Sequence, residues 1–123
     1  MVTVPGFLLR RLYVKGSLKN TSEGFQFLLK NTLGSGYARK MQPLTVDGEA
    51  LPMGESVLQV DGKAVSFPDV SEQQPFTLGL NKSITVQVRA PRLTAGPHKL
   101  GMGFDVPGLG TLSFDFTDVV QEG

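Results

Sequence analysis

Cysteine and tryptophan are absent from this 123-residue sequence, and histidine occurs once, at position 98. Without cysteine the chain has no disulfide framework, no thiolate nucleophile and no thiolate metal site. With one histidine, a zinc site would need carboxylates for most of its ligands, and the sequence holds no compact acidic cluster. We therefore expect no metal site and no cofactor.

Long hydrophobic runs are also lacking, since no segment approaches the roughly 18 apolar residues of a membrane span. The first five residues lack the basic region and apolar stretch of a signal peptide. We therefore expect a soluble, cytoplasmic protein with no membrane partner. The net charge of +1 argues against a nucleic-acid partner, because such binding relies on a broad cationic surface. The cations concentrate in residues 1–40, where Glu23 is the only acidic residue.

Alternation of apolar and polar residues is the clearest pattern present. Ile84, Val86 and Val88 fall on one face of residues 83–90, as in a half-buried strand. Residues 100–106 and 112–117 alternate in the same way on either side of a loop rich in glycine and proline, which predicts an antiparallel hairpin. The outward glycines 101 and 103 indicate a bulge or a close approach by another backbone.

Two segments with the same pattern, 44–51 and 58–65, each contain an Asp-Gly pair, at 47–48 and at 61–62. This dipeptide accepts the positive φ angles of a type I′ turn, so each segment predicts a tight hairpin.

The N-terminal third fits more than one structure. Residues 25–30 alternate like a strand, although a helix beginning at Ser22 is an alternative. Residues 7–14 fit a helix opened by Pro5 and closed by Gly16, but their aromatic and β-branched residues favour a strand running on to Leu18. Residues 35–42 are interpreted as a loop, and residues 66–76 as holding one helical turn opened by Asp69 or Ser71.

These elements amount to about seven or eight short strands, spaced by roughly 8–14 residues, with turn signals between them. The sequence therefore predicts an all-β fold in which residues 1–123 form a single-domain antiparallel β-sandwich.

Few residues could carry chemistry. His98 could act as a general base, but it follows a Gly-Pro turn, where a ring commonly caps the turn or lies on the surface. Asp115 and Asp118 could form a carboxylate pair, and outward strand positions explain Asp115 equally well. Asp47 and Asp61 fit turns better than a calcium site. No nucleophile elbow, phosphate-binding loop or dinucleotide motif is present. We therefore predict no catalytic, cofactor-binding or metal-binding residue in this chain.

Two surfaces remain as candidates. Arg89, Arg92 and His98 are candidate ligand contacts, since a sugar or small anion would need an aromatic or arginine-lined groove. The N-terminal segment combines apolar area with guanidinium groups, a composition typical of interface hot spots. Its candidate partner-interface residues are Phe7, Leu8, Arg10, Arg11 and Tyr13. The alternative is that Phe7, Leu9 and Leu12 belong to the core.

The order of several motifs resembles a known family. Residues 16–20 (GSLKN) and 24–27 (GFQF) precede the two Val-Asp-Gly turns and residues 93–100 (LTAGPHKL). In this order and spacing, residues 12–117 resemble the C-glycoside deglycosidase β-subunit-like proteins. The resemblance implies a β-sandwich accessory subunit that pairs with a larger, TIM-barrel subunit of sugar-isomerase type. It also implies that the metal and catalytic residues belong to that partner.

Three functional hypotheses follow. The first is a non-catalytic subunit that binds this larger partner in carbohydrate or glycoside metabolism, as part of a C-glycoside deglycosidase-like lyase. The second is a stand-alone module that binds a carbohydrate or another small ligand, and the third is a small enzyme centred on His98. A homo-oligomer is compatible with the first two, because unpaired strand edges invite pairing.

Overall fold

Antiparallel strands dominate the structure, a computed structural model that describes residues 5–34, 36–60 and 62–122. The strand predicted over residues 83–90 is confirmed, and it lies at the centre of the first sheet. There β10 (Ser83–Arg89) pairs along its length with β2 (Gly24–Lys30), so that Val86 lies opposite Phe27. The sheet order is β1-β2-β10-β7-β8, with β1 (Lys19–Asn20), β7 (Ser56–Val60) and β8 (Lys63–Ser66).

The second sheet is built on the predicted hairpin. Its two ten-residue strands are β11 (Pro97–Val106) and β12 (Gly110–Val119). Beyond β11 lie β5 (Thr45–Val46) and β6 (Glu49–Ala50), and β4 (Lys40–Met41) also pairs with β11. A third, two-stranded sheet joins β3 (Gly36–Ala38) to β9 (Phe76–Leu78).

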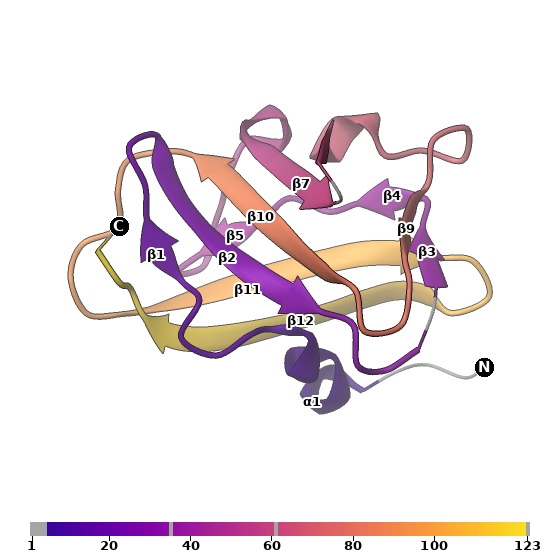
Figure 1. Cartoon of the computed structure of the whole chain (residues 1–123), viewed down its shortest axis with the longest axis horizontal. Helices are drawn as coiled ribbons and strands as arrows, with labels where there is room; N and C mark the ends of the chain where they lie inside the picture. The colour runs from indigo at the N-terminus through magenta and orange to yellow at the C-terminus, as the bar shows by residue number, and fades with distance from the viewer. Residues whose placement is uncertain (1–4, 35, 61, 123) are drawn as a thin grey trace.

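The helical segments are short. They are α1 (Gly6–Leu9) and the 3₁₀ turns η1 (Arg10–Leu12), η2 (Met53–Glu55) and η3 (Phe67–Asp69). Figure 1 shows α1 beside β12, which is an edge strand of the second sheet. A covered edge offers fewer unpaired backbone groups to another chain.

The core lies between the two five-stranded sheets, where β2 and β10 run diagonally across β11 and β12 (Figure 1). Phe27 of β2 contacts Phe116 of β12 with ring centroids 5.2 Å apart, so the inward faces of the two sheets meet. Alternation on each strand explains this burial, because every second side chain points to the same face. The largest fully buried apolar side chains are Phe25, Phe27, Phe67, Leu18, Leu44, Leu58, Leu100 and Val86.

Several local predictions are confirmed. Residues 24–30 form a strand, and residues 66–76 contain a helical turn as expected. This turn spans Phe67–Asp69 and begins after Ser66, and not at Asp69 or Ser71 as predicted. Asp47 and Gly48 connect β5 to β6 with φ angles of 52° and 88°, as a type I′ turn requires. In the second predicted turn Gly62 has a φ of 80°, whereas Asp61 lies outside the described residues.

Other predictions are wrong. The predicted all-β class is confirmed to the extent that antiparallel strands dominate the structure. The predicted number of strands is wrong, because the described residues contain twelve strands and not seven or eight. Four of them (β1, β4, β5 and β6) have two residues each, too few for an alternation to show. Two of the additional strands, β3 and β4, lie within the predicted loop 35–42. The predicted strand over residues 7–14 is α1 followed by η1, with Pro5 at the N-cap of α1.

The glycines of β11 make room for neighbouring side chains and not for a bulge. A Cβ atom at Gly101 would collide with the hydroxyl of Thr45 on the adjacent β5. One at Gly103 would press against the side chain of Gln42.

Candidate functional site

His98 is the second residue of β11 and lies against the β5–β6 turn. Its Nδ1 is 2.7 Å from Oδ2 of Asp47, and its Nε2 is 2.7 Å from the carbonyl oxygen of Thr94. The second carboxylate oxygen of Asp47 accepts the backbone N–H of Lys99 at 2.9 Å. The His98 side chain is only 11 % exposed, so these protein groups take the place of water around the ring.

Both acceptors around His98 favour its charged form, because a carboxylate and a carbonyl each require an N–H donor. The hydrogen bond to Asp47, then the one to Thr94, raises the pKa of His98 above its ordinary value. The backbone N–H of Lys99, then the His98 ring, lowers the pKa of Asp47. The two groups therefore stabilise each other as an ion pair.

This arrangement suits a structural role. A general base must present a nitrogen lone pair to its substrate, and here both ring nitrogens face protein acceptors. The pair instead joins the β5–β6 turn and the Thr94 loop to the beginning of β11.

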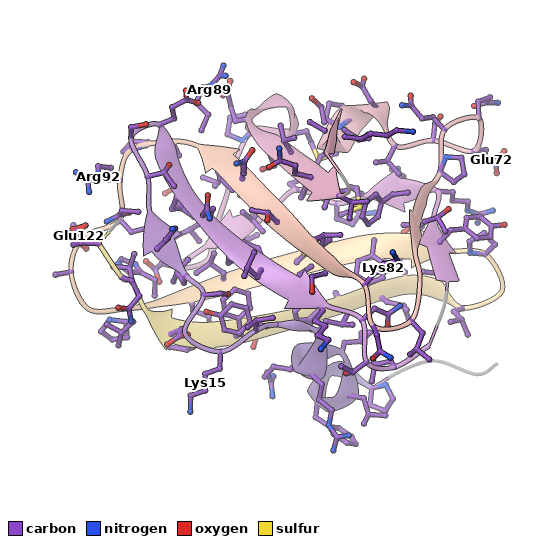
Figure 2. The ribbon with its side chains drawn as sticks, viewed as in Figure 1. Lys15, Glu72, Lys82, Arg89, Arg92 and Glu122 are labelled. Atoms are coloured by element: carbon purple, nitrogen blue, oxygen red, sulfur yellow. The ribbon has the colours of Figure 1, made fainter. Side chains whose placement is uncertain are left out.

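Of the other candidate ligand contacts, Arg89 is the last residue of β10, and Arg92 lies within the connection between β10 and β11. Figure 2 shows Arg92 beside Glu122, and the two side chains are 3.1 Å apart. Arg89 lies 4.0 Å from Glu23, with both side chains exposed. Arg89, Arg92 and His98 thus each have a carboxylate partner of their own. Their use as ligand contacts stays a prediction.

The N-terminal candidates fall in two groups. Phe7 is 65 % exposed on α1, Leu8 is half-buried, and Arg11 is exposed. Arg10 is also exposed, but its Nε donates to the backbone oxygen of Asp115 at 2.6 Å. The side chain of Tyr13 points inward, and its ring stacks on the ring of the buried Phe116. Phe7, Arg10 and Arg11 are therefore the exposed members of the five, and Arg10 is already bonded to Asp115.

Sequence reasoning missed the cluster around Tyr13. Its hydroxyl donates to Oδ2 of Asp118 at 2.6 Å, and the backbone N–H of Gly16 donates to the same oxygen at 2.7 Å. Burial, then the bond to Asp118, raises the pKa of Tyr13 to about 12. Burial alone would raise the pKa of Asp118, but the hydrogen bonds from Tyr13, Gly16 and Val119 outweigh it and lower the pKa. These hydrogen bonds connect the segment that contains Tyr13 and Gly16 to Asp118 of β12.

The two carboxylates near the C-terminus do not form a pair. Asp115 accepts from Arg10 at 3.3 Å and lies 3.8 Å from Lys99, whereas Asp118 faces Tyr13. In the part of the chain that the structure describes, no group of three or more His, Cys, Asp or Glu residues is placed to hold a metal ion. No described helix is long and apolar enough to cross a membrane.

A cavity of about 300 Å³ lies between the sheets, next to the β3–β9 sheet. Its lining is largely apolar and comes from all three sheets and the N-terminal helical segment. Leu29, Leu58 and Ile84 line it from the first sheet, and Met41, Met102 and Leu112 from the second. Sequence alternation marks the lining residues on β2, β7, β10, β11 and β12 as inward-facing, whereas Met41 belongs to the segment interpreted as a loop. No sequence pattern shows where the packing of inward side chains leaves a space.

Together the fold and these sites define a β-rich domain whose one histidine is held in a structural ion pair. The family model described as "Hydroxymethylglutaryl-CoA reductase, N-terminal domain" matches residues 8–121. Because the match spans most of the chain, this protein belongs to that family. Among curated proteins, none matches the chain.

This finding corrects the family predicted from the sequence. The resemblance to C-glycoside deglycosidase β subunits is wrong, because the chain belongs to the reductase family. The Val-Asp-Gly motifs that carried it are hairpin-turn signals, and turns of this type occur in many unrelated β proteins. The predicted partnership with a sugar-isomerase-like subunit and the alternative of a stand-alone ligand-binding module are overturned with it.

Proposed function

We propose that this chain is a non-catalytic domain of a hydroxymethylglutaryl-CoA reductase, an enzyme of the mevalonate pathway to isoprenoids. The family match over residues 8–121 carries the proposal. In this proposal the chain supplies a folded surface to the enzyme, and the groups that bind and reduce the substrate lie outside it.

The chemistry of the described residues supports a non-catalytic role. A reductase that transfers hydride must bind a nicotinamide or flavin cofactor, and such sites carry recognisable motifs. The sequence has no glycine-rich dinucleotide fingerprint. His98 is held by Asp47 and Thr94 and presents no free nitrogen to a substrate.

The surface around α1 is the part of the chain that we propose contacts the rest of the enzyme. Phe7 is 65 % exposed there, compared with 40–52 % for the other exposed large hydrophobic residues of the described chain. Arg11 is close by in sequence and also exposed. Exposed aromatic and arginine side chains are enriched at protein interfaces.

For the architecture, we propose a single-domain, two-layer antiparallel β-sandwich. The contact between Phe27 and Phe116 and the core shared by both five-stranded sheets support this arrangement. Nuclear Overhauser effects between the two rings would test it, since a sandwich requires them and separate sheets would not give them.

The test of the function is an assay of substrate-dependent NADPH and NADH oxidation. The purified chain is measured alone and with the catalytic part of the reductase from the same organism. We expect no turnover from the chain alone and a change in turnover when the two are mixed. Turnover by the chain alone would contradict the non-catalytic role. If mixing has no effect and the two proteins do not associate, the proposed domain function is wrong.

A further inference from the structure

The cavity between the sheets has a defined opening. Most of its lining is buried, and among the residues that the structure describes the exposed lining residues are Leu33, Gly34, Gly36 and Tyr37. The cavity therefore reaches the surface between the end of β2 and the β3–β9 sheet, the region at the right of Figure 1.

The rim at this opening is held in place by Asn31. The Asn31 amide donates to the carbonyl of Gly34 at 2.6 Å, and its oxygen accepts the N–H groups of Leu33 and Gly34 at 3.1 and 3.2 Å. Its backbone N–H donates to Lys82 O at 2.9 Å and its carbonyl accepts from Asn81, which ties the rim to the turn before β10. The opening is thus part of the folded structure.

The buried lining offers little to a polar ligand. Leucine, isoleucine, methionine and phenylalanine supply most of it, and the Asn31 side chain bonds to its own turn. A polar group inside would lose its bonds to water without replacement. Tyr37, 46 % exposed at the rim, is placed to meet a polar group that stays near solvent.

We propose that this cavity binds an unbranched aliphatic chain of about ten carbon atoms, with the chain inside and its polar end at the rim near Tyr37. The size follows from the volume of about 300 Å³, because a dry apolar cavity of about 150 Å³ accepts benzene, with six carbons. Pockets of this size and composition are typical of small-molecule sites. The proposal rests on the cavity and does not depend on the family's enzymatic role.

The test uses 1-decanol as the probe and the methionine methyl groups as reporters. Met41 and Met102 line the cavity, whereas Met53 does not, so Met53 is an internal control. With ¹³C-methyl-methionine labelling, we expect 1-decanol to shift the resonances of Met41 and Met102 and to leave that of Met53 unchanged. The expected dissociation constant is on the order of 10 to 100 μM.

A matched ligand and a matched variant sharpen the test. Triethylene glycol monoethyl ether has nearly the length of 1-decanol but carries oxygens along its chain, and we expect no binding. Ala38→Leu places extra carbon atoms in the cavity lining, and we expect at least a tenfold loss of 1-decanol binding. Ala64→Leu makes the same exchange at an exposed site on β8 and should bind like the unmodified chain.

If Ala38→Leu does not fold, the methionine shifts in the unmodified chain still decide the question. No shift of Met41 and Met102 in a solution saturated with 1-decanol would overturn the proposal. Equal shifts at Met41, Met53 and Met102, or equal binding of the glycol ether, would overturn it as well, because either result means that the probe binds elsewhere than in an apolar cavity.

Discussion

The ring of Tyr13 stacks on that of Phe116, with centroids 3.6 Å apart and planes inclined by 11°. Two residues further along β12, Asp118 accepts the hydroxyl proton of the same tyrosine. One side chain thus combines an aromatic contact with the core and a hydrogen bond to a carboxylate. Through both, the segment that follows η1 is fixed to the edge strand of the second sheet.

Replacing Tyr13 by phenylalanine should keep the stacking and remove the hydrogen bond. Because the lost bond joins a partly buried donor to a charged acceptor, we expect the free energy of unfolding to fall by about 1–3 kcal/mol. Urea denaturation measures this change. Tyr37→Phe is the control, since Tyr37 is 46 % exposed and should change stability by less than about 0.5 kcal/mol. Equal effects of the two substitutions would refute the role given to Tyr13.

The single histidine makes the His98–Asp47 pair directly measurable by NMR, because the titration has one imidazole signal. We expect the pKa of His98 to lie above its ordinary value of 6.5. In Asp47→Asn, which removes the carboxylate, that pKa should fall. A pKa at or below 6.5 in the unmodified chain would contradict the observed geometry.

The same pair predicts how stability depends on pH. Folding raises the pKa of His98. Its contribution to the free energy of unfolding is therefore complete below pH 6.5 and is lost as the pH rises through the folded-state pKa. Folding lowers the pKa of Asp47. Its contribution to the free energy of unfolding is therefore complete above pH 3.8 and is lost as the pH falls through the folded-state pKa. The stability difference between the unmodified chain and His98→Ala should therefore be largest between these two pKa values. A difference that grows above pH 7 would contradict this.

Gly101 tests the close packing of β11 on β5. Gly101→Ala should lower the free energy of unfolding by about 1–2 kcal/mol, because its Cβ atom meets the Thr45 hydroxyl. Thr45→Ala in the same background should recover part of the loss, as a double-mutant cycle would show. Gly54→Ala is the control, because nothing lies within 4 Å of a Cβ atom there. Additive effects at positions 101 and 45 would count against the contact.

Long alternating segments were predictable from the sequence, and short ones were not. Residues 83–89 and the β11–β12 hairpin each place at least three apolar residues on one face, enough for a period of two to emerge. The two-residue strands β1 and β4 exist because longer strands beside them supply hydrogen-bond partners. Such pairing depends on contacts between distant residues, which a local pattern does not contain.

The N-terminal helix shows a second reason why the sequence alone does not predict every element. Residues 7–14 carry both helix and strand signals, and the packing of α1 against β12 decides between them. Arg10 contributes by donating to the Asp115 backbone oxygen, a contact across more than a hundred residues. Some contacts of the site residues were also not predictable from local sequence, because the partners lie far away along the chain. The His98 ring contacts the Thr94 carbonyl oxygen next to the predicted turn, but its other partner, Asp47, lies 51 positions away in the sequence.

The exposed surface of α1 gives a prediction about association. Phe7→Ser should weaken binding of the chain to the catalytic part of the reductase by tenfold or more, because it removes an exposed aromatic side chain from the proposed contact. Its melting temperature should not change, since the ring is 65 % exposed. Val119→Ser is the matched control, because Val119 is 49 % exposed but lies on β12. Loss of binding in the control alone would place the contact on β12.

The central claim, that this chain is a domain of a hydroxymethylglutaryl-CoA reductase, is tested most directly by isothermal titration calorimetry. The chain is titrated into the purified catalytic part of the reductase from the same organism, and the heat of binding is measured. A domain of that enzyme should bind at one site per catalytic chain, with a dissociation constant in the micromolar range or below. No heat of binding at concentrations up to about 100 μM, with both proteins folded, would contradict the account.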